Sequence, residues 1–303
     1  MNCDQPRQIG YIVSQKMKHC KHGVFEFLEN DILVGRSLNA YGEFSEHEVR
    51  LYQQLIKEHD YVVEVGSNIG AHTIPIAKML RLGHILAFEP QRILYDLLRK
   101  NIWHNYKFRN NVLSFPYAVG NRNERINLPT FDYSHKDFYS SSLVWDSDMK
   151  PMMIEGAKVD QLESVQMVTL DSFQLHVCDF LKVDVDGCEL EVLEGAQETI
   201  RRCSPIIYIE NDREDRSAKL IEYIQSFGYD LWWDICPAFF PVNFFNNSEN
   251  VFPPAFISVM MLCIPKKSAK HYTSFTSQIA DVKGPDDTWK REEVVSRPFE
   301  VKK

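Results

Sequence analysis

Runs of hydrophobic residues alternate along the chain with segments in which hydrophobic positions recur every three or four residues. The runs predict buried strands, and the longer period predicts helices that bury one face. The predicted strands cover residues 61–65, 84–88, 112–117, 179–185, 205–210, 229–235 and 257–264, and the predicted helices cover 45–59, 71–81, 91–104, 189–200 and 215–227. This alternation indicates an α/β fold with helices on both faces of a mostly parallel sheet.

Two parts of the chain depart from this alternation. Residues 121–168 are rich in polar and aromatic side chains, which predicts short strands or a loop insertion. The segment after Pro265 is polar and without pattern, which predicts an extension or a disordered tail. At the start of helix 45–59, Ser45 followed by Glu48 fits a capping box.

Composition permits one large domain and limits its partners. The 303 residues are 44% hydrophobic, enough for a sizeable core, and the net charge of −8 argues against nucleic acid or an anionic membrane surface. No hydrophobic run reaches the ~18 residues of a membrane-spanning helix. Seven cysteines, an odd number without a Cys-x-x-Cys pair, and an N-terminus without the hydrophobic region of a signal peptide predict reduced thiols in a cytoplasmic protein.

The candidate chemistry lies where two predicted strands each end in a carboxylate. Glu64 precedes a loop that contains Gly66, Ser67, Asn68 and Gly70. Glu89, at the end of the next strand, can accept both hydroxyl protons of a ribose, so a nucleotide cofactor is expected. The loop lacks the Gly-x-Gly-x-x-Gly pattern of dinucleotide sites, and a carboxylate before it would repel a pyrophosphate. A Rossmann dehydrogenase is therefore disfavoured.

Further motifs give the chain a family resemblance. The acidic-x-Gly-x-x-x-Gly loop is typical of class I S-adenosylmethionine-dependent methyltransferases. With Tyr41-Gly42-Glu43 upstream and Lys182-Val-Asp-Val-Asp-Gly187 downstream, residues 23–264 resemble the FkbM family, with Glu64 in place of its commoner Asp and Asp186 in place of its commoner Glu. The resemblance implies a doubly wound, mostly parallel, seven-stranded Rossmann-like sheet whose last strand, 257–264, runs antiparallel at the edge. It divides the chain into an N-terminal extension (1–60), a methyltransferase catalytic domain (61–264) and a polar C-terminal tail (265–303).

In such a sheet the ligand lies beyond the carboxyl ends of the strands. Tyr41, Glu43 and the loop are expected at the methionine moiety, Glu89 at the ribose and the segment from Ala118 at the adenine. The full set expected at S-adenosylmethionine is Tyr41, Glu43, Glu64, Gly66, Ser67, Asn68, Gly70, Glu89, Pro90, Ala118 and Asp184. Asp184 is the first candidate for the base that removes the acceptor's proton, with Glu210 beside it.

Asp184, Glu210 and Asn211 also form a candidate Mg²⁺ site, since catechol O-methyltransferase-like enzymes place two carboxylates and an asparagine at similar strand ends. The leading activity is O-methylation of a sugar or a related polyhydroxylated small molecule or glycan, with residues 239–247 as an acceptor wall rich in aromatic and Asn side chains. The alternatives are N- or carboxyl-methylation of a small metabolite or peptide, and a catalytically silent module that binds a partner.

Overall fold

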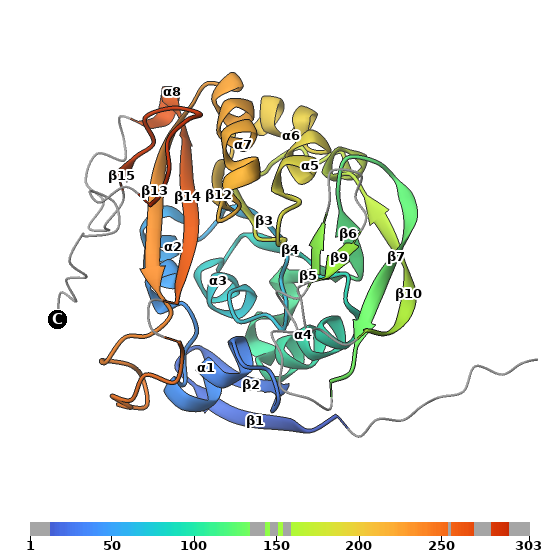
Figure 1. Ribbon diagram of the computed structural model, residues 1–303, viewed down its shortest axis with the longest axis vertical. Coiled ribbons are helices and arrows are strands. Elements are labelled where there is room, and N and C mark those ends of the chain that lie inside the picture. The colour runs from blue at the N-terminus through green and yellow to red at the C-terminus, as the bar shows by residue number, and fades with distance from the viewer. Residues whose placement is uncertain are drawn as a thin grey trace, which may run out of the picture.

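The computed structural model describes residues 13–133, 143–145, 151–153, 159–253, 256–269 and 280–290, and every structural statement below concerns these residues. Eight strands form one sheet in the order β5-β4-β3-β11-β12-β14-β13-β15 (Figure 1). They are β3 (Tyr61–Val65), β4 (His84–Phe88), β5 (Val112–Phe115), β11 (Phe180–Val183), β12 (Ile206–Glu210), β13 (Tyr229–Pro237), β14 (Ile257–Pro265) and β15 (Ala280–Asp281). Seven are the strands that the sequence predicts, and β15 adds an eighth.

The central strands are parallel and in register at their carboxyl ends. Val65 of β3 pairs with Phe88 of β4 on one side and with Val183 of β11 on the other. Strand β14 runs antiparallel, as expected, but the expected edge position is wrong, because β14 lies between β12 and β13. Residues 259–265 of β14 are all buried, and an unbroken hydrophobic run of this kind is stable only where both faces of the strand are covered.

Helices cover both faces of the sheet. They are α1 (Val34–Tyr41), α2 (Glu46–Leu55), α3 (Thr73–Met79), α4 (Arg92–His104), α5 (Glu189–Glu194), α6 (Gln197–Cys203), α7 (Glu214–Ser226) and α8 (Lys266–Ala269). Side chains of α5, α6 and α7 form one core with one face of the strands, and those of α2 and α3 form a second core with the other face. The doubly wound α/β class expected from the sequence is therefore confirmed.

Two details of the helices differ from the sequence prediction. Ser45 has a left-handed backbone (φ 41°) and its side chain caps nothing, so the expected capping box is wrong and Glu48 is used elsewhere. The helix expected over 189–200 breaks into α5 and α6 at Gly195, where a Cβ would lie 2.0 Å from the Gly120 carbonyl oxygen. The close approach of these two chain segments explains the break.

Smaller elements surround the main sheet. The hairpin of β1 (Gln15–Cys20) and β2 (Gly23–Leu28) packs with α1 against α4. The interruption at 121–168 contains two strands of a separate sheet, in which β10 (Val159–Val168) lies between β6 (Tyr117–Val119) and β7 (Glu124–Phe131), and the pair β8 (Leu143–Trp145) and β9 (Pro151–Met153). Short 3₁₀ turns, η1 (Tyr106–Asn111) and η2 (Leu170–Phe173), precede β5 and β11.

Residues 280–290 of the C-terminal tail pack against the sheet. Strand β15 pairs with β13, and the Trp233 indole N–H donates a 3.2 Å hydrogen bond to Asp287 Oδ2. Trp233 is fully buried while its neighbour Trp232 is not, as strand alternation predicts. Residues 1–12 of the expected N-terminal extension, and 270–279 and 291–303 of the expected tail, lie outside the described residues. No helix among the described residues is long and hydrophobic enough to span a membrane.

Candidate active site

A cavity of about 460 Å³ lies at the carboxyl ends of β3, β4, β11 and β12. Because these strands are parallel, the residues that follow them meet at one edge of the sheet. The lining residues from this edge are Glu64, Gly66, Ser67, Asn68, Glu89, Pro90, Gln91, Lys182, Asp184, Val185, Asp186, Glu210, Asp212 and Arg213. The rest of the wall consists of Leu33, Val34, Phe44, Ser45, Glu48, Ala71, His72, Leu94, Ala238, Phe256, Ile257 and Ser258.

Glu64 is fully buried at the end of β3. Its Oε2 accepts a 2.5 Å hydrogen bond from the Thr73 hydroxyl, whereas its Oε1 is buried without a hydrogen-bond partner in the described structure. Burial raises the pKa of Glu64 to about 7, although the ammonium of Lys182 opposes this shift. A buried carboxylate oxygen without a partner suits a cationic ligand group.

The loop after β3 brings three strand ends together. Gly66 has a φ of +83°, and a Cβ at this position would lie 1.8 Å from the Asp184 carbonyl oxygen, so only glycine fits. The backbone N–H groups of Gly66 and Ser67 both donate to the Phe88 carbonyl oxygen, at 3.0 and 2.9 Å. The loop is thus fixed between β4 and β11.

Glu89, at the end of β4, is held by the backbone. The N–H groups of Asn68 and Gln91 donate to its two carboxylate oxygens at 2.9 and 2.8 Å. Burial raises the pKa of Glu89 to about 7, and these two hydrogen bonds oppose the shift. Each oxygen keeps a second lone pair, so the carboxylate can still accept hydroxyl protons from the cavity.

Lys182 is a buried cation in the middle of the site that the sequence prediction missed. Its Nζ donates a 2.8 Å hydrogen bond to Asp184 Oδ2, and its side chain is 1% exposed against 35% for Asp184. Burial alone would lower the pKa of Lys182, but the carboxylates of Asp184, Glu64 and Glu48 raise it well above its ordinary value. A lysine inside a four-residue buried strand was the signal in the sequence, because such a cation needs anionic partners.

The cavity wall contains a second group that was missed, Glu48 of α2. Its Oε2 accepts a 2.9 Å hydrogen bond from the Tyr52 hydroxyl, and its Oε1 accepts one of 3.2 Å from the Ser258 hydroxyl of β14. Glu48 is 2% exposed, and burial raises its pKa to about 7. The capping-box pattern concealed this residue, because it assigned the side chain to the helix end.

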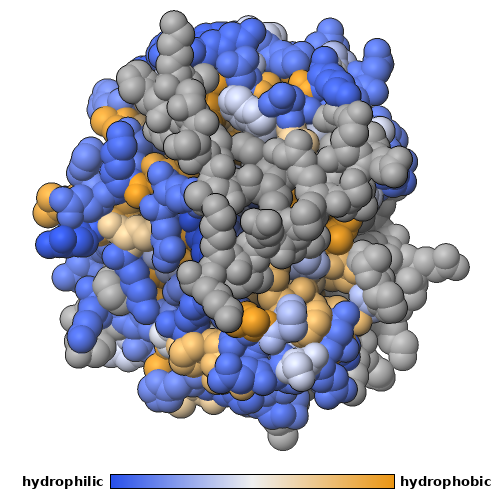
Figure 2. Space-filling view, turned by 90° about the vertical axis from the view of Figure 1, so that its left-hand side faces the viewer, coloured by the Kyte–Doolittle hydropathy of each residue, from blue (hydrophilic) through white to orange (hydrophobic). Residues whose placement is uncertain are grey.

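Tyr41 and Glu43 do not line the cavity and instead hold the segment between β13 and β14. The Tyr41 hydroxyl donates to the carbonyl oxygen of Glu249 at 3.0 Å and accepts from the N–H of Val251 at 2.8 Å. Glu43 Oε2 accepts from the N–H of Phe244 at 3.1 Å. Figure 1 shows this segment beside α1, at the left-hand side of the molecule. Figure 2 looks at that side and shows hydrophobic residues gathered on its lower part.

Three other expected residues also lie outside the lining of the cavity. Ala118 is buried in β6, which pairs with β10. Gly70 has a φ of +88° and packs against Leu98 of α4, which shapes the loop rather than the cavity wall. Asn211 is buried, and its side-chain N–H donates to Met261 Sδ at 3.2 Å.

The candidate Mg²⁺ ligands do not form a common site. Asp184 and Glu210 line the cavity, but Asp184 is already bonded to Lys182, and Asn211 is directed to Met261. Among the described residues, no group of three or more His, Cys, Asp or Glu side chains has the arrangement of a metal site. The residues present therefore do not fit the cation.

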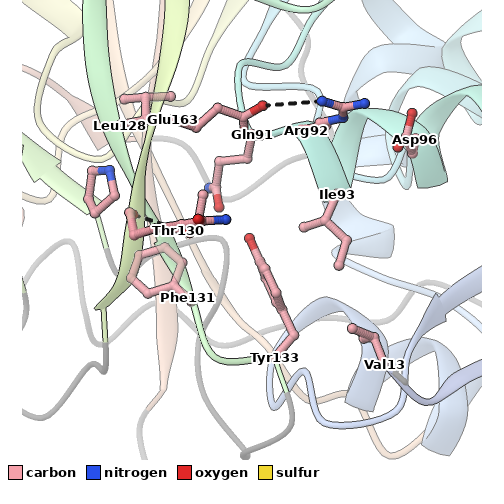
Figure 3. Close-up of a pocket in the computed structure, with 12 residues that line it drawn as sticks. Val13, Gln91, Arg92, Ile93, Asp96, Leu128, Thr130, Phe131, Tyr133 and Glu163 are labelled. Atoms are coloured by element: carbon pink, nitrogen blue, oxygen red, sulfur yellow. Dashed lines mark hydrogen bonds and ion pairs between the residues drawn. The ribbon is translucent and has the colours of Figure 1, made fainter. Parts of the chain in front are cut away.

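A second cavity of about 270 Å³ lies between the start of α4 and strands β7 and β10 (Figure 3). The phenol of Tyr133 points into it, and Arg92 Nη1 lies 3.9 Å from Glu163 Oε1 across its wall. Gln91 lines both cavities, so this residue separates the second cavity from the first.

Comparison with known proteins identifies similar sequences. The family described as "Methyltransferase FkbM domain" matches residues 64–231. Methyltransferase sdnD of Sordaria araneosa is 25% identical over 178 residues, which cover 49% of this chain and 68% of sdnD. Hexuronic acid methyltransferase AglP of Haloferax volcanii is 25% identical over 159 residues, which cover 52% of this chain and 59% of AglP.

Solved structures with similarity to the chain are more distant in sequence. The structure of methyltransferase FkbM from Methylobacillus flagellatus KT is 15% identical, with a TM-score of 0.46, and the match covers 68% of this chain and 44% of that one. The structure of M. jannaschii TYW2 in complex with AdoMet is 14% identical, with a TM-score of 0.42, and the match covers 84% and 88% of the two chains.

Proposed function

We propose that this chain, which belongs to the FkbM family of S-adenosylmethionine-dependent methyltransferases, methylates a hydroxyl group of a sugar or a related polyhydroxylated acceptor. The name of one relative, hexuronic acid methyltransferase AglP, supports an acceptor of the carbohydrate class. That relative is only 25% identical and is matched over 59% of its length, so the acceptor is argued from the site of this chain.

The residues at the carboxyl ends of β3 and β4 fit S-adenosylmethionine. When bound, the cofactor supplies an electrophilic methyl group on a sulfonium cation. The unpartnered Oε1 of Glu64 would accept a hydrogen bond from the ammonium of the methionine moiety. Glu89 would accept the ribose hydroxyls, with Pro90 and Leu94 beside it in the wall.

The charge of the cavity wall is the observation that carries the choice of a hydroxyl acceptor. Carboxylic acids outnumber basic groups there: the acids are Glu48, Glu64, Glu89, Asp184, Asp186, Glu210 and Asp212, and the bases other than His72 are Lys182 and Arg213. In their ionised forms these acids attract a cationic cofactor and repel an acceptor that carries a carboxylate. It also offers proton acceptors, which an aliphatic hydroxyl needs and a carboxylate does not.

The same charges argue against carboxyl-methylation and leave N-methylation of a cationic acceptor as the second candidate. An amine fits an acidic wall as well as a hydroxyl does, so the acceptor atom is decided by experiment. No step through Mg²⁺ is derived, since Asp184, Glu210 and Asn211 do not form a common site for it.

The test uses S-adenosylmethionine with a tritium-labelled methyl group and a panel of p-nitrophenyl glycosides. Neutral glycosides, amino-sugar glycosides and glucuronides are compared at equal concentration. We expect label on the neutral glycosides, little on the glucuronide, and product that survives mild alkali, which hydrolyses methyl esters but not ethers. Label on the glucuronide alone, released by alkali, would contradict the proposal, and label on the amino sugars alone would favour N-methylation.

A further inference from the structure

Glu48 is a carboxylate of the cavity wall that has no role at the proposed cofactor site. It belongs to α2, and its neighbour in the wall, Ser258, belongs to β14, so both lie apart from the strand ends that hold Glu64 and Glu89. We propose that Glu48, rather than Asp184, contacts the acceptor hydroxyl and takes its proton. This inference rests on the proposed hydroxyl acceptor and adds to it the location of the base.

The carboxylate of Glu48 is fixed in one orientation by two hydroxyl groups on separate elements. Tyr52, one turn further along α2, donates to Oε2 at 2.9 Å, and Ser258 donates to Oε1 at 3.2 Å. Each oxygen retains a lone pair that can accept a further hydrogen bond. A base held by packed elements keeps the geometry that proton transfer requires.

Asp184 and Glu210, the two candidates expected from the sequence, are less suited to the role. Asp184 Oδ2 is already bonded to the ammonium of Lys182 at 2.8 Å, so this oxygen is directed to the protein rather than to an acceptor. Burial, together with the nearby carboxylates of Asp184 and Asp212, raises the pKa of Glu210 well above its ordinary value. This raised pKa favours the protonated form of Glu210, which cannot take another proton.

The surroundings of Glu48 set its affinity for a proton near neutrality. Burial raises its pKa to about 7; Lys182 of β11 and Tyr52 lower it, and Asp184 and Asp234 of β13 raise it. His72, before α3, has its Nε2 3.9 Å from Glu48 Oε2, and burial lowers the pKa of this histidine well below 6.5, so it faces Glu48 as a neutral ring. A base works best when its pKa lies near the working pH.

Methyl transfer from the cofactor to the acceptor hydroxyl balances in protons and electron pairs and needs no further reactant. The acceptor oxygen forms its bond to the methyl carbon, and the carbon–sulfur bonding pair stays on sulfur as a neutral thioether. The hydroxyl proton passes to Glu48 and returns to water after product release. Lys182 and Asp184 act in this scheme as positioning residues, since both line the cavity and their ion pair holds the two side chains together.

The test compares Glu48→Gln with Glu46→Gln, a matched control on the same helix. Glu46 is also buried, at 5% exposed, but it pairs with Lys21 and His22 and does not line the cavity. With tritium-labelled cofactor and the neutral glycoside that gives the highest rate, Glu48→Gln should lose about 100-fold or more in kcat. It should bind S-adenosylhomocysteine normally in calorimetry, and Glu46→Gln should keep both properties.

The pH dependence distinguishes a base from a structural residue. The wild-type rate should rise with pH through about pH 7 and then level off. This rise in rate should be absent in Glu48→Gln. Tyr52→Phe removes a hydrogen bond to the ionised carboxylate, which should raise the pKa of Glu48. The rise in rate of this variant should therefore occur at higher pH. A Glu48→Gln enzyme that methylates the hydroxyl at the wild-type rate would overturn the inference while leaving the proposed function intact.

A second measurement needs no acceptor and remains decisive if no glycoside reacts. In protein labelled with carbon-13 at the glutamate carboxyl, the resonance that Glu48→Gln removes should titrate near pH 7. Titration near the ordinary value of 4.5 would overturn the inference. If S-adenosylhomocysteine binds and no hydroxyl is methylated, the proposed function fails on its own, separately from the titration.

Discussion

Replacing Glu64 by glutamine should stabilise the cofactor-free protein at alkaline pH. The pKa of Glu64 rises from 4.5 to about 7 on folding, because burial penalises its charge, and its side chain is fully buried. Below pH 4.5 Glu64 is protonated in both the folded and the unfolded state, and its charge does not reduce the free energy of unfolding. Between pH 4.5 and pH 7 the folded state holds a proton on Glu64 that the unfolded state has released, so the free energy of unfolding falls as pH rises. Above pH 7 the loss reaches about 3 kcal/mol, at ~1.4 kcal/mol per pKa unit.

Urea denaturation at pH 5 and pH 8 measures this effect. Glutamine resembles the protonated side chain and can still accept from Thr73, so the variant should match the wild type at pH 5 and exceed it by about 3 kcal/mol at pH 8. Glu46→Gln is the control of opposite sign: burial alone would raise the pKa of Glu46, but His22 and Lys21 lower it below 4.5, so this variant should lose stability at pH 8. Equal stability of the Glu64→Gln variant and the wild type at pH 8 would refute the reasoning.

Three further predictions concern the cofactor site. Glu89→Ala should weaken S-adenosylhomocysteine binding by ~1–3 kcal/mol in calorimetry, because the ribose loses a charged acceptor, whereas Glu163→Ala, in the second cavity, should bind normally. Gly66→Ala should be less stable in urea than Gly228→Ala by about 1–3 kcal/mol, since both positions have a positive φ but only the first places the new Cβ against backbone. EDTA should leave methyl transfer unchanged; activity that disappears with EDTA and returns with Mg²⁺ would contradict the ligand geometry of Asp184, Glu210 and Asn211.

The sequence predicted the central sheet well because periodicity and chain order constrain it strongly. Strands β3 and β4 have the predicted bounds, since each is a hydrophobic run closed by a carboxylate and a turn. The position of β14 was not predictable from periodicity, because a run buried on both faces gives no information about its neighbours. Strand β15 was missed because two residues are too few to show a pattern.

Within the site, local motifs were predictable and contacts between distant segments were not. Glu64 is near the end of β3, and Gly66 and Glu89 directly follow β3 and β4, so their place at the strand ends could be inferred from the sequence. Glu48 and Ser258 are 210 residues apart and meet only because α2 packs beside β14. Tyr41 was expected at the cavity, but its hydroxyl binds the backbone of the segment between β13 and β14, a pairing that no spacing in the sequence indicates.

The short strand β15 has a consequence for the behaviour of the protein in concentrated solution. Without it, the nine-residue strand β13 would end the sheet as an edge of unpaired backbone groups, rich in hydrophobic side chains. Edges of this kind add strands from other molecules and lead to aggregation. By pairing with Trp232 and Trp233 at the middle of β13, two residues interrupt that edge, so a segment remote from the chemistry helps to keep separate copies from joining sheet to sheet.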